Sequence, residues 1–97
     1  MRLSSEKVRF LHSAIKHIRP NADVYLFGSR TDDEKKGGDI DILVIDKVAL
    51  TLSEKLDITV AFNELFGVQK LDIVSYTPDC TEPFKKVALS TAEILVP

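Results

Sequence analysis

Two aspartates one residue apart open a β-branched apolar run: Asp39-Ile40-Asp41 leads directly into Ile42-Leu43-Val44-Ile45. Successive side chains of a strand point to opposite faces of its sheet, so the two carboxylates would share one face. At a separation of roughly 6 Å and an effective dielectric near 20, their repulsion is about 3 kcal/mol. A divalent cation or a proton would offset that repulsion. The spacing therefore predicts a metal site.

A third acid belongs with this pair. The tetrapeptide Lys-Leu-Asp-Ile occurs at 55–58, inside a helical pattern, and again at 70–73, inside a strand pattern. We therefore expect Asp57 to be solvated and Asp72 to join the other two acids, provided that its strand lies beside theirs. Magnesium takes oxygen ligands and keeps water and substrate phosphates in its shell. One or two magnesium ions on three carboxylates could support in-line phosphoryl transfer, with Asp39 and Asp41 as metal ligands and Asp72 as a second-metal ligand or general base.

A possible phosphate-binding element precedes the acids. Gly28-Ser29 ends the apolar run Val24-Tyr25-Leu26-Phe27. A glycine lets backbone approach a phosphate closely, and exposed amides and the Ser29 hydroxyl could donate hydrogen bonds to it. Arg30, Lys35 and Lys36 could add positive charge around a leaving pyrophosphate. Taken singly, a Gly-Ser pair is more often an ordinary turn and an Asp-x-Asp pair is often just solvated, so the argument depends on their combination in this order.

The elements that must position these residues follow from hydrophobic periodicity. Apolar residues at helical spacing predict helices after a Ser4 cap, over 53–66, and from Pro83 to Leu95. Strands are expected at 24–27, 39–45 and 71–76, separated by Gly, Pro and polar segments. The predicted fold class is α+β: a small mixed three-stranded sheet packed with helices in the order α-β-β-α-β-α. The last two strands, joined through a helix, should be parallel.

Composition limits the remaining possibilities. A chain of 97 residues with 44% hydrophobic content can form one compact core, so we expect a single domain over 1–97. A net charge of −2 argues against broad binding to a nucleic-acid backbone. Cys80 is the only cysteine, and its isolation argues against a disulfide or a zinc site. Neither a signal peptide nor a membrane span is expected, so a cytoplasmic location without a membrane partner is predicted.

The motifs Leu26-Phe27-Gly28-Ser29-Arg30, Asp39-Ile40-Asp41-Ile42-Leu43-Val44 and Leu71-Asp72-Ile73-Val74 resemble those of the minimal nucleotidyltransferase family, in the polymerase β-like superfamily. The resemblance covers nearly the whole chain and implies the nucleotidyltransferase fold. It also implies that Gly28, Ser29 and Arg30 bind a nucleoside triphosphate, ATP or another, and that Asp39, Asp41 and Asp72 coordinate magnesium and carry the catalysis. One departure lies in the nine-residue segment 30–38, which carries the acids Asp32, Asp33 and Glu34 and lacks the glycine that commonly follows the arginine.

The resemblance further implies a partner. Small members of this family often bind an all-helical HEPN-domain protein, and some pairs resemble a toxin and an antitoxin that transfers AMP from ATP to a tyrosine of the toxin. The leading hypothesis is thus a magnesium-dependent nucleotidyltransferase acting on a hydroxyl. The alternatives are a catalytically weak or inactive module that docks a helical partner, favoured if Phe62, Phe66 and Phe84 are exposed, and a domain with no site at all. So small a face must be completed by a partner or by a second copy, so a homodimer is also possible.

Overall fold

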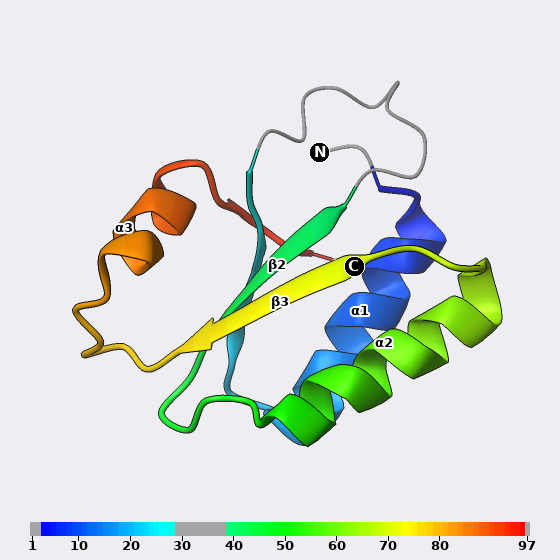
Figure 1. Ribbon diagram of the computed structural model, residues 1–97, viewed down its shortest axis with the longest axis horizontal. Coiled ribbons are helices and arrows are strands. Elements are labelled where there is room, and N and C mark those ends of the chain that lie inside the picture. Colours follow the sequence, from blue (N-terminus) through cyan, green and yellow to red (C-terminus); the bar gives the residue numbers. More distant parts are fainter. Residues whose placement is uncertain (1–2, 29–38, 97) are drawn as a thin grey trace.

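The computed structural model describes residues 3–28 and 39–96, which contain three helices and four strands (Figure 1). Along the chain these are α1 (Ser5–Ile18), β1 (Asp23–Leu26), β2 (Ile40–Ile45), α2 (Leu52–Phe66), β3 (Leu71–Tyr76), α3 (Pro83–Ser90) and β4 (Glu93–Ile94). The segment predicted to follow Gly28, with Ser29, Arg30, Lys35 and Lys36, lies outside the described residues. Within the described ranges, no helix has the length and apolar character needed to cross a membrane.

The strands form one mixed sheet in the order β3-β2-β1-β4. β1 runs antiparallel to both β2 and β4, and β2 runs parallel to β3. Helices α1 and α2 lie on one face of this sheet and α3 lies on the other (Figure 1). The predicted mixed α+β fold and the parallel pairing of the second and third strands are confirmed.

The C-terminal segment differs from the prediction, because the last helix ends at Ser90 and a fourth strand follows. Thr91 closes the helix, its backbone N–H donating to the carbonyls of Ala88 and Leu89. Leu95 N–H then donates to Val24 O at 2.8 Å, which continues the chain along β1. Helical periodicity placed Ala88 and Leu95 on one face, but they enter different cores on opposite faces of the sheet. The sheet therefore has a fourth strand, β4, beside the three that were predicted.

Alternation along β2 divides the interior into two cores. Ile40, Ile42 and Val44 belong to the larger core, which α1 and α2 cover, whereas Leu43 belongs to a smaller core beneath α3. On β3, Val74, the register partner of Leu43, also packs against the smaller core. Side chains at odd positions of β2 and even positions of β3 therefore share the α3 face.

The aromatic residues that would have favoured a docking surface are mostly internal. Phe62 is fully buried and Phe66 is half-buried, and both rings pack edge-on or tilted against each other and against Phe10. Of the three phenylalanines considered, Phe84 alone is classed as exposed, at 42%. Two of the three thus serve the core under α2.

Helices α1 and α2 are joined by a charged contact. Thr51 and Glu54 form a capping box at the start of α2, which satisfies two of the backbone N–H groups of its first turn. The Glu54 carboxylate also accepts hydrogen bonds from the Arg19 guanidinium, with Nη2 to Oε1 at 2.9 Å. The backbone N–H of Thr51 and the Arg19 charge both lower the pKa of Glu54 below its ordinary value.

This contact predicts a pH dependence of stability. Because the pKa of Glu54 is lower in the folded chain than in the unfolded chain, its contribution is complete at neutral pH and is lost as the pH falls through the folded value. Below about pH 4.5 we expect wild type to lose more free energy of unfolding than Glu54→Gln does. Urea unfolding at a series of pH values measures this, with Glu64→Gln on the same helix as control. Parallel pH curves for wild type and Glu54→Gln would contradict the prediction.

Candidate functional site

Two of the three predicted acids lie side by side on adjacent strands. Asp41 of β2 is the register partner of Asp72 of β3 in the parallel pair. Neighbouring strands are about 4.8 Å apart and paired residues point to the same face, so the two carboxylates project together. Asp72 is exposed and Asp41 is half-buried. Asp72 is thus turned to solvent and not into the interior.

Asp39 joins the same side of the sheet. It directly precedes β2, and its Oδ2 lies 3.7 Å from Nζ of Lys70, the residue that directly precedes β3. The backbone confirms this alignment, because Ile40 N–H donates to Lys70 O at 3.1 Å. Asp39 and Lys70 are therefore placed as one further rung of the ladder that contains Asp41 and Asp72.

The acids occupy the part of this face that is nearest to the end of β1. Leu43, the next residue along β2 on the same face, is fully buried in the core beneath α3. Asp41, two positions earlier, is only half-buried. Helix α3 therefore covers the sheet as far as Leu43 but not as far as Asp41, and the acids lie on the uncovered part of this face.

Gly28 lies directly against one of these carboxylates. Phe27 N–H donates to Asp41 O at 3.0 Å, which brings the end of β1 alongside β2. A Cβ added to Gly28 would lie 2.7 Å from Asp41 Oδ2, and the residue has a φ of +85° that side chains rarely tolerate. A side chain at position 28 would therefore strain the backbone and would also force the Asp41 carboxylate to shift. Of the predicted nucleotide-binding residues, Gly28 is described, whereas Ser29 and Arg30 lie outside the described residues.

The Gly28 amide is engaged within the protein. Its N–H donates to Thr91 Oγ1 at 3.0 Å, in the segment between α3 and β4. This amide is therefore directed at a side chain of the protein. Sequence analysis missed Thr91, because the helical pattern placed it inside a helix.

The donor set suits magnesium. Carboxylate oxygens are the ligands that this ion prefers, and it needs only one or two of them beside water and substrate phosphates. Within residues 3–28 and 39–96, no three His, Cys, Asp or Glu side chains are gathered closely enough to form a metal site by themselves. Asp39 contacts Lys70, so it would have to exchange that ammonium for the ion. The set fits an ion that is bound together with its nucleotide.

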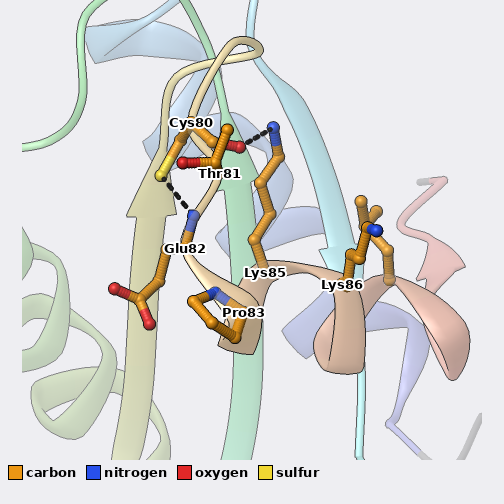
Figure 2. Close-up of a pocket in the computed structure, with 7 residues that line it drawn as sticks. Cys80, Thr81, Glu82, Pro83, Lys85 and Lys86 are labelled. Carbon is orange, nitrogen blue, oxygen red and sulfur yellow. Dashed lines mark hydrogen bonds between the residues drawn. The ribbon is translucent and has the colours of Figure 1, made fainter.

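A separate hollow of about 510 Å³ lies at the start of α3 and shares no residue with the acidic face (Figure 2). Its lining includes the buried Lys85, whose ammonium donates to the carbonyls of Thr77, Pro78 and Cys80 at 3.0, 2.6 and 3.3 Å. Three carbonyl contacts match the three protons of the ammonium group. Lys85 therefore fixes the turn between β3 and α3, a structural role that sequence analysis did not assign.

Comparisons with known proteins agree with this geometry. The family model described as polymerase beta, nucleotidyltransferase matches residues 10–97. The chain is similar to the structure of a candidate minimal nucleotidyltransferase, with 26% identity and a TM-score of 0.62, over 100% of this chain and 96% of the other.

Two solved toxin–antitoxin structures share the fold at lower identity. One contains the tri-AMPylated HEPN toxin of Shewanella oneidensis in complex with its MNT antitoxin, and the similarity has a TM-score of 0.69 and 16% identity over 97% of this chain and 72% of that chain. The other is a toxin–antitoxin with AMP-PNP, with a TM-score of 0.70 and 16% identity over 92% and 72% of the two chains. No protein of curated function matches the sequence significantly. The family match over residues 10–97 shows that the chain belongs to the polymerase β nucleotidyltransferase family.

Proposed function

We propose that this protein is a magnesium-dependent adenylyltransferase that moves AMP from ATP to a tyrosine hydroxyl of a HEPN-type toxin and thereby acts as its antitoxin. The observation that carries the proposal is the alignment of Asp41 with Asp72, with the backbone of Gly28 against the Asp41 carboxylate. Two structures of the same fold support the choice of nucleotide and partner, since one holds a tri-AMPylated HEPN toxin and the other AMP-PNP.

The reaction assigns two tasks to the three acids. The acceptor oxygen forms a bond to the α-phosphorus of ATP, the bond from that phosphorus to the bridging oxygen breaks, and pyrophosphate leaves. Asp72, the more exposed acid, accepts the hydroxyl proton. Asp39 and Asp41 would hold the metal, and magnesium bound there would neutralise part of the phosphate charge. The protein need only position the metal, the nucleotide and the acceptor hydroxyl, because phosphoryl transfer depends mainly on positioning and on charge neutralisation.

An acceptor could reach Asp72 along a groove beside it. The groove lies between α2 and β3 and is lined by Leu52, Lys55, Leu56, Thr59, Leu71, Asp72 and Ile73. Leu52 and Leu56 are 71% and 54% exposed, so its α2 wall is apolar and open to solvent. Because α2 covers the face of the sheet opposite to the Asp72 carboxylate, a helical partner seated on this wall would have to present its hydroxyl around the edge strand β3 to reach the proposed base.

The same exposed wall favours a second candidate function. Leu52, Leu56 and Val60 recur on α2 at intervals of four residues, which places them along one side of the helix, and each is more than half exposed. A protein that only docks and neutralises a helical partner would need this surface and no carboxylates. Activity therefore distinguishes the two candidates.

The experiment that tests the proposal mixes the protein with labelled ATP, magnesium and the product of the adjacent gene. We expect covalent AMP on a tyrosine of the partner and no transfer by the double variant Asp39→Ala with Asp41→Ala. Co-purification of the partner with both proteins shows that docking is intact. A partner that binds wild type but is never labelled would contradict adenylyl transfer and support the docking function.

A further inference from the structure

The chain leaves β1 through a short segment that is fixed by contacts on several sides. Phe27 N–H donates to Asp41 O, and the Phe27 ring packs edge-on against Phe84 of α3 with centroids 5.9 Å apart. One residue later, Gly28 N–H donates to Thr91 Oγ1 at 3.0 Å. These contacts join the start of the proposed nucleotide-binding element to both β2 and the C-terminal part of the chain.

Thr91 is itself anchored to α3 and β4. Its hydroxyl lies 3.4 Å from Ala88 O, to which it donates, so the same group uses its proton on the helix and its lone pair on Gly28. Ala88 is a buried residue of α3. Two residues after Thr91, Glu93 pairs with Leu26 and so joins β4 to β1. The Thr91 oxygen is thus held by elements that are packed on the sheet.

Glycine needs such an external contact. Without a Cβ, Gly28 can adopt a wider range of backbone angles than other residues, so the residue alone does not fix the direction of the chain. The direction matters here, because Gly28 faces the Asp41 carboxylate so closely that an added Cβ would displace it.

We infer that Thr91 is a positioning residue for nucleotide binding: its hydroxyl fixes the peptide plane at Gly28 and so the place of this glycine against the Asp41 carboxylate. The inference rests on the proposed function, since it assumes that a nucleotide binds at this point. It assigns to the junction of α3 and β4 a role in the site that neither the motifs nor the family match carries.

The test compares three variants by their affinity for AMP-PNP with magnesium, measured by calorimetry, and by hydrogen exchange of the Gly28 amide. Thr91→Val keeps the shape of the side chain and removes the acceptor. Nucleotide binding must then fix the Gly28 peptide without this hydrogen bond, so we expect the affinity to fall about fivefold. Its Gly28 amide should exchange faster. Thr91→Ser retains a hydroxyl, so its affinity for AMP-PNP and the exchange rate of its Gly28 amide should equal those of wild type.

Ser90→Ala is the matched control. The Ser90 hydroxyl donates to Val87 O at 2.6 Å at the same end of α3, so this variant removes a neighbouring hydroxyl contact that belongs to the helix alone. A purely structural role for Thr91 would lower the melting temperature of Thr91→Val and Ser90→Ala together and leave both affinities at the wild-type value. That outcome, or failure of Thr91→Ser to restore binding, would overturn the inference. Absence of binding by wild type would instead overturn the proposed function.

Discussion

Replacing Asp72 with asparagine should lower the rate of adenylyl transfer by about a hundredfold to ten-thousandfold, the usual contribution of a general base. The substitution keeps the size of the side chain and removes its ability to take the hydroxyl proton. Asp72 is exposed on the edge strand β3, so the change buries no new polar group. Transfer of labelled AMP to the partner, followed in initial rates, measures the effect.

The same variant should be slightly more stable than wild type. Asp41 and Asp72 are register partners, and like charges directly opposite one another on neighbouring strands are destabilising by about 0.2–1 kcal/mol. Removing one of the two charges relieves this repulsion. A gain in stability together with a loss of activity is the expected signature of a carboxylate held in place for function.

The chain contains its own control for this prediction. Asp57 occupies the same position in the other Lys-Leu-Asp-Ile tetrapeptide, but there it lies exposed on α2. Asp57→Asn should change neither the rate of transfer nor the midpoint of urea unfolding. An Asp72→Asn protein that transfers AMP at the rate of Asp57→Asn would show that Asp72 is not the base.

Much of this site could be predicted because strand alternation and register are local rules. Asp39 and Asp41 share a face whatever else the fold does, and the apolar residues between and after them specify which face is buried. The position of Asp72 needed one tertiary assumption, that its strand lies beside β2, and the crossover through α2 makes that pairing the common outcome.

The C-terminal part could not be predicted in the same way. Ala88 and Leu95 are seven residues apart, which suits two turns of a helix equally well, and nothing local shows that Thr91 ends the helix between them. The strand β4 exists because Glu93 and Ile94 pair with Leu26 and Tyr25, which lie far earlier in the chain. The contact between Thr91 and Gly28 spans 63 positions and has the same origin. Such contacts depend on packing, so periodicity does not reveal them.

Gly28→Ala should abolish adenylyl transfer, and comparison with Gly67→Ala should show why. Both glycines have a positive φ, +85° and +88°, so an alanine at either position costs about 1–2 kcal/mol of stability through backbone strain. At Gly67 a Cβ would meet nothing within 4 Å, whereas at Gly28 it would meet Asp41 Oδ2 at 2.7 Å. Denaturant unfolding and transfer assays on the two variants separate strain from this contact.

The atom that the new Cβ would meet is the end of the Asp41 side chain. The contact should therefore affect activity more than stability. Asp41 can relieve the clash by rotating its carboxylate, so the two variants should lose similar amounts of stability. That rotation, however, takes the oxygen away from the place where it stands beside Asp72 and would hold the metal. Gly67→Ala should therefore retain transfer and Gly28→Ala should not. If Gly28→Ala kept wild-type activity, the position of the Asp41 carboxylate against the backbone would have no part in the reaction.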